Sequence, residues 1–376
     1  MNRKIIWLIF GVILVVMIFI VISSKRHTEL NQPIKIAALL SLTGDGASWG
    51  ESAQKAIQLA TEEINKNGGI NGRQVDMIYE DTAGDPKKAV SAYQLVTSID
   101  HVVAIIGPLT QTELTAIIPL INKDNIPTVA PDYIPLQNRT DLSNPLLVWM
   151  DAQIEASRIA QYAFSQGIRS VGILGTQDSW ETTISNAFAD EFKSLGGTVT
   201  DMEIVQPTSA DMKLPVTKIV ATKPQAIFIG TYYQFVNSTK ELHDLGYGGK
   251  LFSIEVDDYL AGQTSSWVKD LQFIAPDYYT SSFTQDFKGA YGTAPGLPAG
   301  QSYDATNLLF QLIMSPGVYS SDEVSLRQNI VSVMSRVTEY DGVSGQLEIA
   351  PDGRTTLPTA LFDLKKGTIT RVQSLP

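Results

Sequence analysis

From Ile34 onward, short runs of β-branched residues alternate with longer amphipathic segments. The run Ile34–Leu40 is typical of a buried strand, and residues 51–65 place alanines and isoleucines on one helical face. The glycines of 68–72 predict the end of that helix and a turn into a strand at 75–80. Further helices are expected at 87–99 and 112–121, and further strands at 102–106 and 126–129. This alternation predicts one doubly wound α/β unit with a parallel sheet.

The same alternation restarts near Met150 and predicts a second doubly wound lobe. Its expected helices are 154–165, 181–195, 212–221 and 235–245, and its expected strands are 170–174, 198–204, 226–229 and 251–254. Helices at 303–314 and 324–337 and strands at 359–364 and 368–372 follow. We therefore expect residues 27–150 and 276–342 in the first lobe, and 151–275 and 343–376 in the second. Open α/β sheets bind ligands at the carboxyl ends of their strands, which predicts a site in the cleft between the lobes.

The first 26 residues differ in character from the rest of the chain. Arg3 and Lys4 precede a run without charged residues, 5–22, and Lys25 and Arg26 follow it. A helix of that length would span about 27 Å, close to the thickness of a bilayer's hydrocarbon core. We expect residues 1–26 to be a transmembrane anchor, with a cleaved signal peptide as the alternative because 21–23 is a tolerable cleavage site. Either segment would place the lobes outside the cytoplasm.

Composition narrows the possible functions. The chain has 28 Lys+Arg against 39 Asp+Glu, and four of the basic residues lie in the N-terminal segment. The lobes are therefore strongly acidic, which excludes nucleic acid and anionic lipid as expected partners. There are no cysteines, and the three histidines have no metal-ligand spacing. We expect no metal and no cofactor.

Several short motifs occur in an order and spacing that resemble one protein family. They are 36–44 (IAALLSLTG), 49–51 (WGE), 62–65 (EEIN), 68–72 (GGING), 80–86 (EDTAGDP), 105–108 (IIGP) and 302–305 (SYDA). From about Pro33 onward the chain resembles the leucine/isoleucine/valine-type substrate-binding proteins of ABC importers, which are type I periplasmic binding proteins. The resemblance implies two lobes joined by three crossovers, a Venus-flytrap closure on an amino acid or related solute, and delivery to a membrane permease.

The resemblance also implies a set of ligand-binding residues. In the first lobe it points to an aromatic residue after the first strand, here Trp49, and to the loop holding Thr110, Gln111 and Thr112. In the second lobe it points to aromatic residues near Trp180 and Tyr232 and to an acidic residue matching Glu255.

The chemistry of these residues suits a zwitterion. A helix starting near Thr112 would present free N–H groups to a carboxylate, assisted by Thr110 and Gln111, although simple N-capping explains the same residues. Glu255 follows the expected strand 251–254, where a carboxylate binds an ammonium group well. The alternative for Glu255 is a solvated loop acid beside Asp257 and Asp258.

One segment departs from the family pattern. Where the family often has a hydroxyl-rich Ser-Pro-Ser/Ala-Ala-Thr sequence, this chain has Ala-Pro-Asp-Tyr-Ile at 130–134. Asp132 brings a negative charge to the place where a ligand carboxylate would lie, and this weakens the assignment to a standard branched-chain amino acid. Tyr133, like Trp49, Trp180 and Tyr232, is expected in a loop after a strand, where aromatic rings wall an apolar group or stack on a cation. Packing is the alternative for each ring.

Two enzyme-like patterns carry little weight. Residues 46–50 match a nucleophile elbow around Ser48, but the loop after Leu40 is too long for that turn, and the only histidines downstream are His101 and His243. The glycines at 44 and 46 lack a correctly spaced third glycine for a dinucleotide fold. We therefore expect a binding protein and no enzyme. A receptor ectodomain that signals through a membrane partner is the alternative to import.

Overall fold

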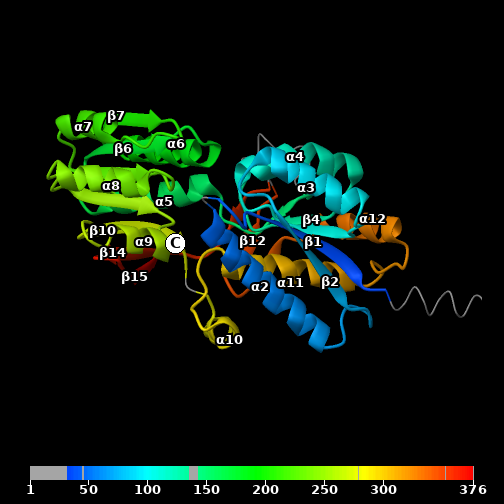
Figure 1. The fold of residues 1–376 in the computed structure, drawn as a ribbon. Coiled ribbons are helices and arrows are strands. Elements are labelled where there is room, and N and C mark those ends of the chain that lie inside the picture. Colours follow the sequence, from blue (N-terminus) through cyan, green and yellow to red (C-terminus); the bar gives the residue numbers. More distant parts are fainter. Residues whose placement is uncertain (1–31, 45, 135–142, 278, 352, 376) are drawn as a thin grey trace, which may run out of the picture.

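The computed structural model describes residues 32–375 except 45, 135–142, 278 and 352. The expected membrane segment, 1–26, lies outside the described residues. Two α/β lobes lie side by side, each with a sheet covered by helices on both faces (Figure 1). The two-lobed α/β fold predicted from the sequence is confirmed. Within the described residues, no helix is long and apolar enough to cross a bilayer.

The first lobe is built on a five-stranded parallel sheet of order β2-β1-β3-β4-β5. Its strands are β1 (Ile34–Leu40), β2 (Val75–Asp81), β3 (Ala104–Ile106), β4 (Thr128–Ala130) and β5 (Leu146–Leu147). Helices α3 (Pro86–Ser98) and α4 (Gln111–Asp124) pack on one face, and α2 (Ala47–Lys66), α11 (Ala299–Met314) and α12 (Glu323–Met334) pack on the other. Helices on both faces explain why β1 is apolar almost throughout.

The second lobe has a seven-stranded sheet of order β15-β14-β10-β9-β8-β6-β7, antiparallel only at β14 and β15. The strands are β6 (Ser170–Thr176), β7 (Thr198–Val205), β8 (Ala226–Gly230), β9 (Lys250–Ile254), β10 (Leu271–Pro276), β14 (Thr359–Lys365) and β15 (Thr368–Leu375). Helices α5 (Ala152–Ser165) and α6 (Ser179–Ser194) cover one face, and α7 (Lys213–Ala221), α8 (Phe235–Asp244) and α9 (Asp258–Thr264) cover the other.

The returning chain adds α10 (Ser281–Tyr291) and a three-stranded sheet of β11 (Glu339–Gly342), β12 (Gly345–Ile349) and β13 (Thr355–Thr356). Leu347 and Leu357 of this region pack in the first lobe's core, whereas β14 pairs in the second lobe. We propose that the last crossover lies near Pro358, later than the boundary at 343 expected from the sequence.

The crossover segments are hydrogen-bonded to one another. The backbone N–H of Asp151 donates to the carbonyl of Thr355 at 2.9 Å, and that of Asp277 donates to the carbonyl of Pro358 at 2.9 Å. The chain therefore passes between the lobes through adjacent segments.

Helix α2 begins at Ala47, four residues before the predicted start at 51. A β-carbon at Gly50 would lie 2.0 Å from the carbonyl oxygen of Ser41, so only glycine allows the first turn of α2 to pack against the end of β1. The glycine of the nucleophile-elbow pattern is thus a packing residue, and Ser48 lies in a helical turn.

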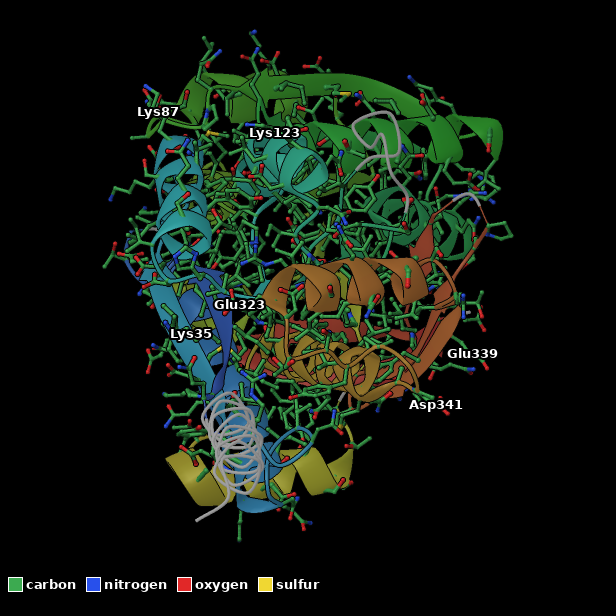
Figure 2. All side chains as sticks on the ribbon, turned by 90° about the vertical axis from the view of Figure 1, so that its right-hand side faces the viewer. Lys35, Lys87, Lys123, Glu323, Glu339 and Asp341 are labelled. Carbon is green, nitrogen blue, oxygen red and sulfur yellow. The ribbon has the colours of Figure 1, made fainter. Side chains whose placement is uncertain are left out.

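Charged side chains mark the outside of the first lobe. Lys87, Lys123 and Glu323 are exposed on its helices and point away from the sheet (Figure 2). Buried carboxyl groups are the exception to this pattern, and several of them gather between the lobes.

Candidate ligand-binding site

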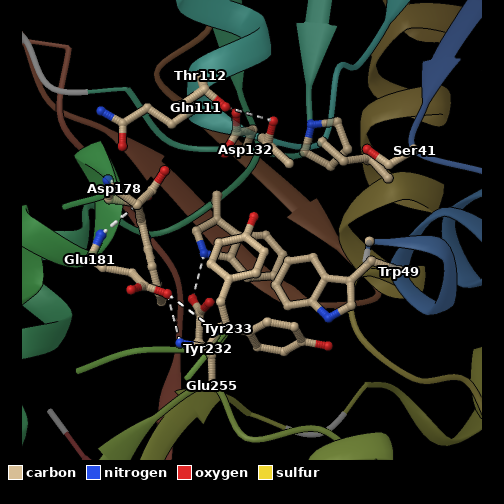
Figure 3. Close-up of a pocket in the computed structure, with 16 residues that line it drawn as sticks. Ser41, Trp49, Gln111, Thr112, Asp132, Asp178, Glu181, Tyr232, Tyr233 and Glu255 are labelled. Carbon is tan, nitrogen blue, oxygen red and sulfur yellow. Dashed lines mark hydrogen bonds between the residues drawn. The ribbon is translucent and has the colours of Figure 1, made fainter. Parts of the chain in front are cut away.

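A cavity of about 110 Å³ lies between the two lobes (Figure 3). The first lobe contributes Ser41, Trp49, Thr110, Gln111, Thr112 and Asp132, and the second lobe contributes Asp178, Trp180, Glu181, Tyr232, Tyr233 and Glu255. Trp149, in the first crossover, completes the wall. This space holds several water molecules or one small organic solute.

The structure brings together nearly all the residues singled out from the sequence. Trp49, Thr110, Gln111, Thr112, Asp132, Trp180, Tyr232 and Glu255 all line the cavity. Tyr133 does not, contrary to the expectation: its side chain is buried in the second lobe's core with Met150 and Ala156. Asp132 lies in a bend directly after β4 and faces the cavity, whereas Tyr133 beside it is turned into the second lobe's core.

Trp49 and Trp180 lie in the first turns of helices and not in loops as expected. Helix α6 begins directly after Asp178, whose Oδ1 accepts a hydrogen bond of 2.9 Å from the backbone N–H of Trp180. This N-cap fixes the direction of the helix and therefore the position of the Trp180 ring at the cavity wall.

Glu255 directly follows β9 and has a φ of 50°, a strained backbone conformation for a residue other than glycine. It is 3% exposed and its Oε1 accepts a hydrogen bond of 2.8 Å from the indole N–H of Trp149. Burial raises the pKa of Glu255 to about 7. The alternative of a solvated loop acid is therefore wrong.

A second carboxyl group, Glu155 of α5, lies behind Glu255 and is fully buried. Burial, followed by the negative charge of Glu255, raises the pKa of Glu155 well above its usual value. Among the described residues no N–H or hydroxyl group donates to either Glu155 oxygen. Burial therefore favours the protonated form of Glu155, beside the Glu255 carboxyl group that lines the cavity.

The start of α4 is not capped in the ordinary way. Thr110 stands at the N-cap position, but its hydroxyl donates to Glu113 Oε2 at 2.6 Å and makes no capping bond. The first-turn N–H groups of α4 thus lack a side-chain cap. Gln111 reaches across the cleft and donates from Nε2 to Ser179 Oγ at 2.9 Å.

Asp132 lies beside this helix start and is 8% exposed. Its Oδ1 accepts a hydrogen bond of 2.7 Å from the backbone N–H of Tyr133, and its Oδ2 has no partner among the described residues. Burial, with the charges of Glu113, Glu255 and Asp178, raises the pKa of Asp132 well above its usual value. The cavity therefore has a carboxyl group at each end.

Aromatic rings form the wall between these ends. The ring centroid of Trp49 lies 5.7 Å from that of Trp149 and 6.0 Å from that of Tyr232. Asp257, just outside the cavity, accepts hydrogen bonds from Trp49 Nε1 at 3.2 Å and from the Tyr232 hydroxyl at 2.9 Å. Because Trp49 belongs to the first lobe and Asp257 to the second, this network joins the two lobes.

Some lining residues were missed from the sequence. Glu181, whose Oε1 accepts from the backbone N–H of Tyr232 at 2.7 Å, is one position beyond Trp180. The sequence Asp178-Ser179-Trp180 is an N-cap signature that would have placed a helix start, and hence Asp178 and Glu181, at the strand exit. Trp149 had no such signal, because the crossover that carries it belongs to no helix or strand.

Comparison with known proteins agrees with this geometry. Residues 33–368 match the periplasmic binding protein family. The chain belongs to this family. Its fold is shared with the leucine-binding protein LivK of Thermotoga maritima, with a TM-score of 0.83 and 22% identity over 91% of this chain and 98% of LivK.

Two curated relatives of this periplasmic binding protein match only part of the chain. The Leu/Ile/Val-binding protein BraC3 of Rhizobium johnstonii is 26% identical over 56% of this chain and 58% of its own length. The chemotactic signal transduction system substrate-binding protein BasB of Halobacterium salinarum is 38% identical over 23% of this chain and 21% of its own length. The chain thus aligns with little more than half of BraC3 and a fifth of BasB.

Proposed function

We propose that this protein is the extracytoplasmic solute-binding component of an ABC importer, which holds an amino acid or a related small solute between its lobes. The observation that carries the proposal is the cavity itself, which both lobes line and whose buried carboxyl group, Glu255, is positioned by Trp149. A buried carboxylate at a strand exit binds an amino group by charge-assisted hydrogen bonds. Membership of the periplasmic binding protein family supports the same function.

Hinge closure would complete the site. Gln111 and Trp49 of the first lobe each contact the second lobe by one hydrogen bond, to Ser179 and Asp257. A solute that touches both lobes only when they are closed shifts the population toward that state. We further propose that residues 5–22 anchor the protein in the membrane beside its permease, and that the protein performs no chemistry on the solute.

The test is a thermal-shift screen of the full-length chain in detergent against amino acids, short peptides, amides, polyamines and sugars. A solute at a hundred times its dissociation constant stabilises the fold by about 2.7 kcal/mol, which raises the melting temperature visibly. Small-angle scattering with each hit then measures compaction. A hit without compaction contradicts hinge closure, and no response to any solute contradicts the proposed function.

A sensing role is the second candidate, favoured by the similarity to BasB, whose name assigns it to a chemotactic signalling system. The same site would then report the solute to a membrane signalling partner. Crosslinking of the full-length chain in its native membrane distinguishes the two roles, because import predicts recovery of a permease and sensing predicts recovery of a signal transducer.

A further inference from the structure

The charge of the cavity is one-sided. Asp132, Asp178, Glu181 and Glu255 line it, and no Lys, Arg or His does so among the described lining residues. The start of α4 offers only about half a positive charge, and Glu113 lies within its first turn. The cavity as a whole therefore favours a positively charged occupant.

The position of Asp132 determines whether the cavity can also accept a ligand carboxylate. Its Oδ2 is buried and has no donor among the described residues, although a buried carboxyl group ordinarily has a partner. Asp132 lies at the end of the cavity beside α4, where the carboxylate of a zwitterion would approach the free N–H groups. A ligand carboxylate placed there would face Asp132: an ionised Asp132 repels it, and the two fit together only when Asp132 takes up a proton.

The remaining wall suits an organic cation and not a metal ion. Trp49, Trp149, Trp180 and Tyr232 present aromatic rings to the cavity, and ring faces attract ammonium groups. Among the described residues no three His, Cys, Asp or Glu side chains lie close enough together to hold a metal ion. A strongly hydrated inorganic cation would also lose its water to a largely aromatic wall.

We propose that the solute is an organic ammonium ion without a free carboxylate, whose positive charge is held between Glu255 and Asp132 and walled by the tryptophans. This rests on the proposed function and specifies its ligand class. Asp132 and Glu255 have no positively charged partner among the described lining residues, and the ligand would supply that counter-charge. Burial raises the pKa of both Asp132 and Glu255, so a bound cation lowers these pKa values and protons are released on binding.

The experiment compares three probes that share the leucine side chain and differ in charge: leucine, 3-methylbutylamine, which is leucine without its carboxylate, and 4-methylpentanoate, which is leucine without its ammonium group. Isothermal titration calorimetry on the full-length chain in detergent measures each affinity. We expect the amine to bind at least about tenfold more tightly than leucine, and the anion not to bind. The N-trimethyl derivative of the amine keeps the positive charge and has no N–H donors. Its affinity therefore tests whether the aromatic rings or the hydrogen bonds to the carboxylates contribute more to binding.

Two variants locate the effect. In Asp132→Asn the preference for the amine over leucine narrows by about tenfold, because the repelling charge is gone and the shape is kept. Asp178→Asn, which keeps a good N-cap for α6, shows a smaller change in the same direction. Asp76→Asn removes one charge from an exposed position on β2 and leaves the preference unchanged.

The outcomes separate the two proposals. If leucine binds as tightly as the amine or more tightly, the inference is overturned and the solute-binding function stands. If the amine is preferred but Asp132→Asn does not narrow the preference, the assignment to Asp132 is overturned. If no probe binds and the wider solute screen is also silent, the proposed function fails and the inference fails with it.

Discussion

The indole N–H of Trp49 and the carboxylate of Asp257 are hydrogen-bonded at 3.2 Å, although 208 positions separate them in the sequence. One residue belongs to the first lobe and the other to the second, so the bond forms only when the lobes are together. Asp257 also caps α9 through the backbone N–H of Leu260 at 2.8 Å, which fixes the position of the acceptor. This bond joins Trp49, which lines the cavity, to the opposite lobe.

Replacing Trp49 by Phe keeps an aromatic ring at the wall and removes the N–H donor. A buried hydrogen bond to a charged group contributes about 1.5–3 kcal/mol, so we expect solute affinity to fall by about ten- to a hundredfold. Calorimetric titration with the best solute from the screen measures it. Trp267→Phe is the matched control, since its N–H donates to Thr239 within the second lobe at 3.1 Å. Equal affinity losses in both variants would contradict the role of Trp49 in closure.

Replacing Gly50 by Ala places a β-carbon 2.0 Å from the carbonyl oxygen of Ser41. The first turn of α2 must then move, and we expect a loss of about 1–3 kcal/mol in unfolding free energy together with weaker solute binding, because Trp49 moves with it. Gly262→Ala in α9 is the control: no atom lies within 4 Å of its added carbon, and alanine favours a helix by up to about 1 kcal/mol. Urea denaturation measures both variants. An unchanged Gly50→Ala protein would refute the packing argument.

The stability of the empty protein should depend on pH through Glu255. Burial raises its pKa from 4.5 to about 7, so the folded protein holds this proton more tightly than the unfolded chain. That stabilisation is fully present below about pH 4.5 and is lost as the pH rises through about 7. We expect the urea-unfolding free energy to fall over this range by an amount on the order of 1–3 kcal/mol.

The Glu255→Gln variant should show a shallower decline, and the double variant with Glu155→Gln a shallower one still, because Glu155 is buried beside Glu255 with a raised pKa of its own. Glu348→Gln, an exposed position on β12, serves as the control and should follow the unmodified protein. A pH profile that is the same in all four proteins would show that this pair does not titrate in the range.

Asp304 of α11 holds the turn between β11 and β12. Its carboxylate accepts from the backbone N–H of Val343 at 2.7 Å, from that of Ser344 at 2.9 Å, and from the Ser344 hydroxyl. Asp304→Ala leaves these donors unsatisfied, and we expect a loss of about 2–4 kcal/mol in unfolding free energy. Thermal denaturation measures it against Asp286→Ala, an exposed position on α10. A loss no larger than that of the control would contradict the structural role of Asp304.

The features that could be predicted from the sequence are those that depend on residues close together in the chain. Buried strands such as β1 and β8 are short apolar runs, and the carboxyl end of β9 placed Glu255 at the cleft without any knowledge of its partners. Asp85 before Pro86 is a helix-start signature within two positions of the chain, and its side chain caps α3. Each of these depends on neighbours within a few positions in the chain.

Features that depend on distant segments could not be predicted. Trp149 meets Glu255 across 106 positions, and its neighbours in sequence carry no helical or strand period. The early start of α2 depends on the close contact of Gly50 with Ser41. A glycine in the sequence does not indicate which segment will pack against it. The orientation of Tyr133 could not be predicted either. Asp132 and Tyr133 lie in an irregular segment, and the sequence does not show which of the two side chains turns toward the cavity.

Trp149 lies on the crossover itself, where its carbonyl accepts a hydrogen bond from Thr355 on a neighbouring crossover. In a hinge motion, residues near the hinge axis move little and residues far from it move much farther. In the hinge motion proposed above, we expect the Trp149 indole to keep its hydrogen bond to Glu255 when the lobes open, whereas rings farther from the crossovers separate from the opposite lobe. Different residues would then bind the solute first and hold it afterwards. Substitutions near the crossovers should change the association rate of the solute, and substitutions of the aromatic residues farther away should change its dissociation rate.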